Sequence, residues 1–227
     1  MNYWKKIFFC IKEKKQFFLL FFLFIFCALM ALFFIGNKEF SHYVNGISTN
    51  TADTFFYFIT YLGDGIFASL FLIFLLLFRL NIGVLSITVL IIPGMLTQIL
   101  KRFCFPNFPR PSVVFNSLIN NNNWHLIEGV DLHSYFSFPS GHTTTVFSIC
   151  CLSILIIKNK IYHVPILFLG VFTGFSRIYL SQHFLIDVFV GSIIGCLGSL
   201  LLYVAFKDLF FSSRWGRFSI FKLMLKK

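Results

Sequence analysis

Residues 17–35 read FFLLFFLFIFCALMALFFI, an apolar run without a single charged side chain. A helix needs roughly 20 such residues to cross the hydrocarbon core of a bilayer. Similar runs recur along the chain, which is 58% hydrophobic and 12% charged, with a mean hydropathy of +0.84. An ordinary soluble domain carries about 25% charged residues. The sequence therefore predicts an all-α, polytopic membrane protein with a single domain.

The apolar runs predict a bundle of six transmembrane helices. The first run resembles a signal peptide because lysines precede it, but it is long for a signal core and no small-x-small cleavage site follows it. The second is interrupted near its outer end by Gly63-Asp64-Gly65. The expected spans cover residues 17–35, 55–78, 82–100, 140–157, 164–179 and 184–206. An even number of spans places both termini on one side of the membrane.

The connection between the third and fourth spans is the longest. Residues 103–138 include an asparagine run and acidic side chains, so this segment is too hydrophilic to cross the bilayer and should form a loop or cap on the outer surface. Within the last span, Gly191 and Gly195 form a small-xxx-small pair that lets another helix approach closely. We expect this pair to serve helix packing.

The net charge of +11 is distributed unevenly over the two sides of this six-helix scheme. Most cations fall on the side of the termini: Lys5, Lys6, Lys12, Lys14, Lys15, Arg79, Lys158, Lys160, Lys207, Arg214, Arg217, Lys222, Lys226 and Lys227. Lysine and arginine collect in cytoplasmic loops, so both termini should be cytoplasmic and the opposite face periplasmic or exterior, with the chain in the inner membrane. Topology thus explains the surplus charge, and nucleic-acid binding is not expected.

Polar residues on the outer side gather in three clusters at helix ends, which include all of the cations expected on that side except Lys38. The clusters are Lys101 to Pro111, Pro139-Ser140-Gly141-His142, and Ser176 to Asp187. Because the third span ends, the fourth begins, the fifth ends and the sixth begins on this side, the clusters share one membrane face. A bundle could therefore bring them to a single ligand.

The residue types in these clusters suit a phosphate. Lys101, Arg102, Arg110 and Arg177 supply fixed positive charge, and the planar arginine fork matches phosphate oxygens. Ser140 and Gly141 open a helix, whose free backbone amides favour an anion. Cations at helix ends also often extend to the membrane interface without further function, which is the competing interpretation for Lys101 and Arg102.

Two histidines of these clusters could carry out chemistry on that phosphate. His183 and Asp187 are four residues apart, so the carboxylate can hold one ring nitrogen and leave the other free to attack phosphorus. A carboxylate inside a span is costly unless it is paired, which favours this arrangement over a structural accident. His142 is then left as the acid that protonates the leaving oxygen. The remaining histidines are expected to be structural or solvated: His42, His125, His133 and His163.

These motifs resemble those of the type 2 phosphatidic acid phosphatase (PAP2) superfamily. Its second motif, Pro-Ser-Gly-His, is intact at residues 139–142, and its third, Ser-Arg-x5-His-x3-Asp, is intact at 176–187. The first motif, Lys-x6-Arg-Pro, is lengthened, since eight residues separate Lys101 from Arg110 and seven separate Arg102 from it. Either cation could fill the lysine position, and we assign it to Lys101.

The resemblance implies a fold, a reaction and a set of roles. The fold would be the family's six-helix bundle, and the resemblance covers residues 55–206. His183 would be the nucleophile that forms a phosphohistidine, Asp187 would orient it, and His142 would protonate the leaving group. The phosphate would be held by Lys101, Arg110, Ser140, Gly141 and Arg177. The family needs no metal or other cofactor, and the sequence offers no carboxylate cluster for a hard cation.

The resulting functional hypothesis is an integral membrane phosphatase acting on a lipid phosphate or lipid pyrophosphate. Candidate substrates are undecaprenyl pyrophosphate, phosphatidic acid, phosphatidylglycerophosphate and lipid A, and nothing in the sequence points to a protein partner. One alternative is a lipid phosphotransferase that uses the same phosphohistidine. A non-enzymatic alternative is an anion transporter, although transporters usually place ionisable groups near the bilayer midplane.

Overall fold

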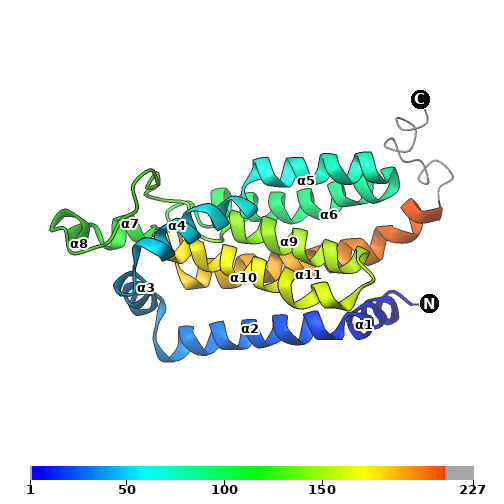
Figure 1. The fold of residues 1–227 in the computed structure, drawn as a ribbon, viewed down its shortest axis with the longest axis horizontal. Coiled ribbons are helices and arrows are strands. Elements are labelled where there is room, and N and C mark those ends of the chain that lie inside the picture. Colours follow the sequence, from blue (N-terminus) through cyan, green and yellow to red (C-terminus); the bar gives the residue numbers. More distant parts are fainter. Residues whose placement is uncertain (1, 213–227) are drawn as a thin grey trace.

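The computed structural model describes residues 2–212, which fold into helices and loops without a strand in that range (Figure 1). The elements are α1 (Tyr3–Glu13), α2 (Lys15–Phe34), α3 (Asn37–Gly46), α4 (Asn50–Ile59), η1 (Thr60–Gly63), α5 (Gly65–Phe78), α6 (Leu80–Ile99), η2 (Leu100–Cys104), α7 (Pro111–Val114), α8 (Asn116–Asn120), α9 (Gly141–Ile156), η3 (Lys160–Tyr162), α10 (His163–Tyr179) and α11 (Leu185–Ser212). The expectation of an all-α fold is confirmed.

Four helical segments are long and apolar enough to cross a membrane. They are Lys15–Phe34, Leu80–Cys104, Lys160–Tyr179 and Leu185–Ser212. A fifth span is possible if Asn50–Gly63 and Gly65–Phe78 count together, with a bend of 53° between them. Gly141–Ile156 is apolar but shorter. The described residues therefore give four spans, or five with the bent pair, and the number six stays a prediction.

The interruption of the second apolar run is a real break in the helix. Asp64 has extended backbone angles between η1 and α5, and its carboxylate accepts a hydrogen bond from the Ile66 amide at 2.7 Å. An aspartate in this position satisfies an amide that has no partner within the helix, so it ends one helix and starts the next. The break places Asp64 on the same end of the bundle as the polar clusters.

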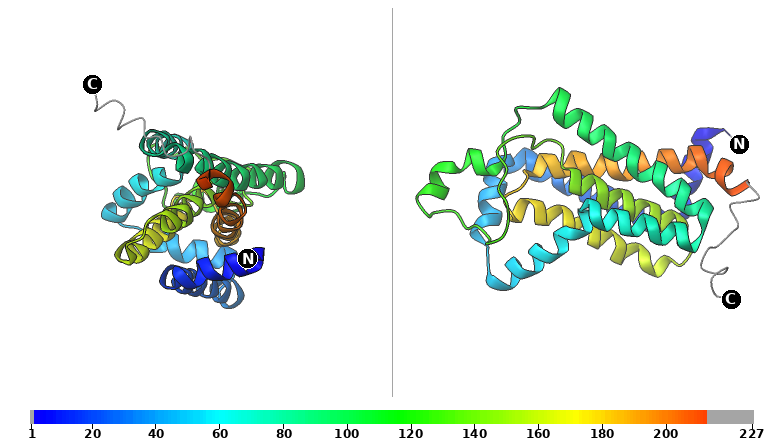
Figure 2. Two further views of the ribbon diagram at one scale, coloured as in Figure 1. Left: turned by 90° about the vertical axis from the view of Figure 1, so that its right-hand side faces the viewer. Right: turned by 90° about the horizontal axis from the view of Figure 1, so that it is seen from above.

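Helix α9 occupies the middle of the bundle, where it packs against α6, α10 and α11 (Figure 2). The pair of small residues predicted to allow close packing lies at its contact with α11. A Cβ at Gly191 would lie only 2.7 Å from the Ser140 carbonyl oxygen, and one at Gly195 would collide with the Thr144 carbonyl oxygen. The glycines therefore let the start of α11 lie directly against the start of α9.

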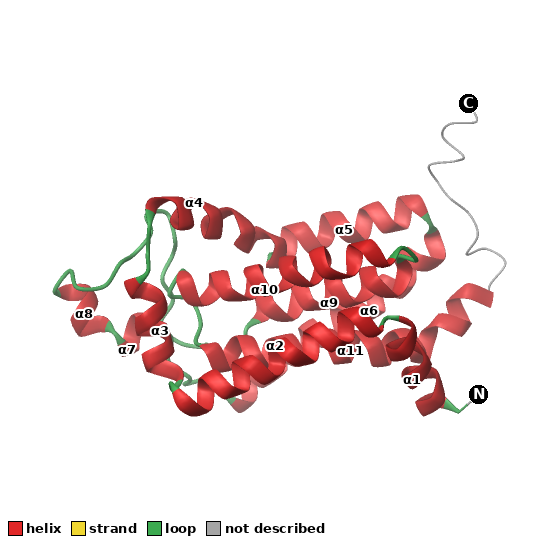
Figure 3. Cartoon of the chain, turned by 60° about the horizontal axis from the view of Figure 1, so that its bottom comes forward, coloured by secondary structure: helices red, strands yellow, loops and turns green. Residues whose placement is uncertain are grey.

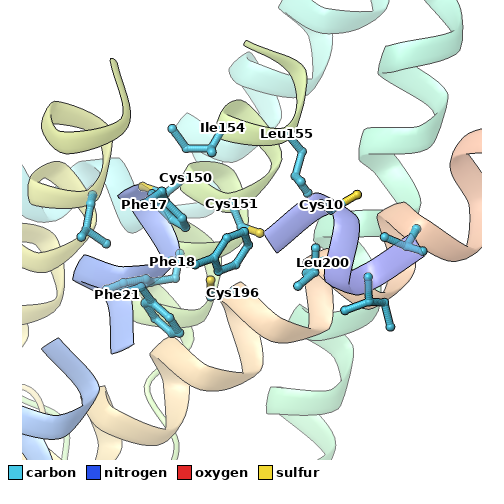
Figure 4. Packing of buried hydrophobic residues seen from close by; sticks show 14 of the residues in the cluster. Cys10, Phe17, Phe18, Phe21, Cys150, Cys151, Ile154, Leu155, Cys196 and Leu200 are labelled. Carbon is cyan, nitrogen blue, oxygen red and sulfur yellow. The ribbon is translucent and has the colours of Figure 1, made fainter. Parts of the chain in front are cut away.

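Helix α2 is attached to this centre by aromatic packing. Phe17, Phe18 and Phe21 are fully buried and belong to one apolar cluster with Cys151 and Cys196 (Figure 4). Lipid tails are as apolar as these side chains, so close van der Waals packing is what favours such contacts between membrane-spanning helices. The cysteines act here as small apolar side chains.

The two ends of the bundle differ in content. Helix α1 contacts α11 at one end, where Lys6 pairs with Asp208. Loops and the short helices α7 and α8 gather at the other end (Figure 3). This second end contains the segment 103–138, which forms no candidate span, as expected. Five cations assigned to the cytoplasmic side lie outside the described residues: Arg214, Arg217, Lys222, Lys226 and Lys227.

Candidate active site

A cavity of about 330 Å³ opens at the loop-bearing end of the bundle. Its lining includes members of all three polar clusters: Lys101, Arg110, Gly141, His142, Arg177 and His183. These residues come from η2, the loop before α7, the start of α9, the end of α10 and the turn before α11. The fold thus brings together side chains separated by up to 82 positions in the sequence.

His183 and Asp187 form the contact that their spacing indicated. Nδ1 of His183 lies 3.1 Å from Oδ2 of Asp187, and both side chains are buried. The same carboxylate oxygen accepts hydrogen bonds from the Phe184 amide at 3.0 Å and from the Ser137 hydroxyl. With Nδ1 held by the carboxylate, Nε2 is the nitrogen that remains for a substrate.

The surroundings keep this imidazole uncharged. Burial lowers the pKa of His183 well below its usual value, and the positive charges of Arg110 and Lys101 lower it further. A neutral ring retains the lone pair that a nucleophile needs. A lowered pKa therefore favours a free lone pair on this ring at neutral pH.

Three cations face the cavity without a carboxylate partner within residues 2–212. Arg110 donates through Nη1 to the Gln182 carbonyl at 3.0 Å and through Nε to the Tyr135 carbonyl at 3.0 Å. Arg177 donates to Thr60 Oγ1 at 2.8 Å, and its buried Nε has no partner. Lys101 is 8% exposed. Buried charges are unfavourable unless compensated, so this arrangement calls for an anionic ligand.

The structure separates the two candidates for the lysine of the first motif. Lys101 is buried and lines the cavity, whereas Arg102 is exposed and does not. Both lie in η2, a π-helical turn closed by a hydrogen bond from the Phe105 amide to the Leu100 carbonyl at 2.9 Å. The wider turn changes the direction of the side chains relative to an α-helix, and it turns Lys101 inward despite the lengthened motif.

Ser140 and Gly141 occupy different positions at the start of α9. Gly141 lines the cavity, where a Cβ would lie 3.6 Å from Gln98 Nε2. Ser140 is fully buried and outside the lining, and its hydroxyl accepts from the Thr143 amide and hydroxyl. Its backbone amide donates to the Asp187 carbonyl at 3.1 Å. The position of Ser140 is thus that of a helix cap which also fixes α9 to α11.

Several residues at the site were not identified from the sequence. Oδ2 of Asp64 lies 3.7 Å from Nε2 of His142, and the break at Gly63–Gly65 was the only signal for it. His133, expected to be structural or solvated, lines the cavity. Ser137 and Gln182 contact Asp187 and Arg110, and no local pattern marks either of them.

Comparison with known proteins identifies the family to which this chain belongs. A model described as the PAP2 superfamily matches residues 82–211, more than half of the chain. The chain belongs to the PAP2 superfamily. The match includes the ends of α6 and α10 and the starts of α9 and α11, which carry the site.

Two PAP2 relatives are similar in sequence. The lipid A 4'-phosphatase of Porphyromonas gingivalis is 27% identical over 187 residues, covering 76% of this chain and 72% of the relative. The undecaprenyl-diphosphatase BcrC of Bacillus subtilis is 36% identical over 73 residues, covering 32% of this chain and 36% of its own length. The protein is accordingly a PAP2-type phosphatase.

Two solved structures of PAP2 proteins share the fold. LpxE of Aquifex aeolicus superposes with a TM-score of 0.61 at 31% identity, covering 73% of this chain and 93% of that one. The PAP2-type phosphatidylglycerolphosphate phosphatase of Bacillus subtilis gives a TM-score of 0.60 at 21% identity, covering 89% and 98%. The second, at its lower identity, supports the fold alone. Together with the apolar helices, these neighbours identify a membrane protein.

Proposed function

We propose that this PAP2 protein hydrolyses the terminal phosphate of a lipid phosphate or lipid pyrophosphate through a phosphohistidine on His183. The observation that carries the proposal is the composition of the cavity. Lys101, Arg110 and Arg177 surround it without a carboxylate partner in residues 2–212. His142 and His183 also line it. A phosphate is the ligand that three such cations would hold, and two histidines are what its transfer requires.

The first step of the proposed reaction is attack on the phosphate. Nε2 of His183 donates its lone pair to phosphorus while the bond from phosphorus to the leaving oxygen breaks, and protonated His142 gives its proton to that oxygen. Asp187 stabilises the positive charge that develops on the His183 ring. The cations and the backbone amides at the start of α9 stabilise the equatorial oxygens of the transition state.

The second step regenerates the enzyme. Neutral His142 takes a proton from a water molecule, whose oxygen attacks the phosphohistidine as the phosphorus–nitrogen bond breaks. Inorganic phosphate then leaves the cavity, and His142 is again protonated for the next substrate. Each step uses only side chains of this chain, so we expect activity to persist in the presence of a chelator.

A lipid substrate is supported by the position of the site and by the relatives. The site lies at one end of the apolar helices, where a headgroup would be while its tail stays in lipid. The relatives are named for lipid A, undecaprenyl diphosphate and phosphatidylglycerolphosphate. Undecaprenyl pyrophosphate, phosphatidic acid, phosphatidylglycerophosphate and lipid A are therefore the candidates. The charge distribution supports an inner-membrane protein with six spans, cytoplasmic termini and a periplasmic site.

The proposal is tested with purified protein in detergent and a panel of these lipid phosphates. Phosphate release should depend on enzyme, and the His183→Ala variant should serve as the blank. Radiolabelled substrate, quenched in base, should leave label on the protein that is stable to alkali and lost in acid. Full activity of His183→Ala would refute the assigned nucleophile, and label transferred to a second lipid without free phosphate would refute hydrolysis.

A further inference from the structure

A second cavity, of about 230 Å³, adjoins the candidate active site. It shares His133, His142 and Arg177 with the first cavity but does not include Lys101, Arg110 or His183. The two cavities therefore adjoin at His133, His142 and Arg177, and His183 lines only the first of them. The role inferred below for the second cavity rests on the proposed phosphatase reaction.

In phosphoryl transfer the attacking and leaving atoms lie roughly in line through phosphorus. With His183 as the nucleophile, the leaving oxygen points away from His183 and toward the acid His142. The group attached to that oxygen must then continue into the space beyond His142. Because His142 also lines the second cavity, we assign the leaving group to that cavity, and its lining would then determine which leaving groups fit.

The chemistry of this lining differs from that of the phosphate cavity. Among the described residues that line it, Arg177 is the single lysine or arginine, and Arg177 also lines the phosphate cavity. Two acidic residues, Asp64 and Asp131, also line the second cavity. Tyr61 donates to the hydroxyl of Tyr57 at 3.3 Å, which leaves the Tyr57 proton available to a ligand. The lining thus offers acceptors and hydroxyls.

We propose that the second cavity binds a hydroxyl-bearing headgroup, a sugar or a glycerol, and that the protein prefers lipid phosphomonoesters on such headgroups over lipid diphosphates. Sugar and glycerol hydroxyls donate well to carboxylates and exchange hydrogen bonds with tyrosine. The departing half of a diphosphate is itself a phosphate, which two carboxylates would repel. The same carboxylates therefore favour phosphomonoesters on hydroxyl-bearing headgroups and disfavour diphosphates.

The outer loop supplies a fixed wall of this subsite. Gly129, Val130, Asp131 and His133 all lie in the segment 103–138. Gln182 Nε2 donates to the Asp131 carbonyl at 2.9 Å, and the Arg110 amide donates to the Ser134 carbonyl at 2.9 Å. The first bond joins the loop to the residue before His183, and the second connects the two ends of the loop to each other. At about 230 Å³ the cavity is smaller than the roughly 300–1,000 Å³ of sites for drug-sized ligands and suits one ring or glycerol unit.

The test compares specificity constants of the full-length protein in detergent for four substrates. These are a phosphorylated glycolipid, phosphatidylglycerophosphate, phosphatidic acid and a prenyl diphosphate. The first two carry headgroup hydroxyls from sugar and glycerol, and the third is a monoester without them. We expect kcat/KM for the better of the first two to exceed that for the diphosphate by about tenfold or more, because unpaired polar groups reject a mismatched ligand.

Variants of the second cavity should change this ratio. Asp131→Asn and Asp64→Asn should each lower the preference by about tenfold, and Tyr57→Phe should lower it by a smaller factor. Glu128→Gln is the matched control, since it removes the same charge from the same loop at an exposed position outside the lining, and it should leave the ratio unchanged.

The outcomes separate this inference from the proposed function. A diphosphate that is hydrolysed as well as the hydroxyl-bearing monoesters overturns the inference while the phosphatase reaction stands. Variants of the second cavity that slow the hydrolysis of all four substrates equally also overturn the inference and leave the phosphatase reaction standing. If no substrate loses phosphate in a His183-dependent manner, the proposed function fails and the subsite fails with it.

Discussion

Two buried lysines at opposite ends of the bundle show what distinguishes a binding residue from a structural one. Lys14, between α1 and α2, is 4% exposed, and Lys101, in η2, is 8% exposed. Lys14 donates to the Ile157 carbonyl at 2.9 Å and lies 3.4 Å from Glu13. Lys101 lines a cavity beside two arginines and has no carboxylate partner within the described range. The first charge is compensated by the protein, and the second calls for a ligand.

The same contrast holds for the carboxylates of α11. Asp187, at its start, is fully buried and bound to His183, Ser137 and the Phe184 amide. Asp208, near its end, is exposed and pairs with Lys6. One end of the helix therefore carries a buried carboxylate bound to an imidazole, and the other end carries one that joins two surface helices.

The largest effect should follow from removing the nucleophile. His183→Ala should lower kcat by at least about 10⁴-fold, since replacement of a residue central to a covalent mechanism removes most of its catalysis. Phosphate release from the best lipid substrate measures this, and circular dichroism of the purified variant controls for folding. A folded variant that retains a tenth of the activity contradicts the mechanism.

The two carboxylates of α11 give the next comparison. Asp187→Asn keeps the shape but loses the charge that orients His183, and it should lower kcat by about 10²–10⁴-fold. Asp208→Asn removes the same charge from the other end of the helix and should leave kcat within about twofold, because an exposed ion pair contributes little. If both variants lost kcat to the same extent, the effect of the Asp187 charge would be on folding of the helix and not on the orientation of His183.

Replacement of Lys101 should affect catalysis, whereas replacement of Lys14 should affect stability. Lys101→Ala should lower kcat/KM by about 10²–10³-fold, as does removal of one group that stabilises transition-state charge, with little change in melting temperature. Lys14→Ala should lower the melting temperature, because a hydrogen bond from a charged group contributes about 1.5–3 kcal/mol, while kcat/KM of the folded protein stays near that of the wild type. The opposite pattern would refute the distinction between them.

The smallest effect is expected for the neighbour of Lys101. Arg102 is exposed and outside the cavity, so Arg102→Ala should change kcat/KM by less than about fivefold. Measured beside Lys101→Ala under identical conditions, it tests whether the π-helical turn selects the inward cation. A loss as large as that of Lys101→Ala would assign the first-motif role to Arg102.

Much of the fold and part of the site followed from local patterns. Apolar runs gave the helices, with α11 extending to Ser212 where residue 206 was expected. The spacing of His183 and Asp187 gave their contact, although His183 precedes α11 and the contact forms as Asp187 accepts from the Phe184 amide. The amphipathic helix α1 was not foreseen, because the lysines around it were interpreted as topology signals.

What the sequence determined by itself is the membrane class, the helical segments and the contact between His183 and Asp187, since hydrophobic run length and motif spacing act over a few residues. Which cations face the ligand was decided only by tertiary structure. Lys101 turns inward and Arg102 outward, and Asp64 reaches His142 from a helix break 78 residues away. Burial and pairing of a charge depend on neighbours from distant segments, which no local pattern specifies.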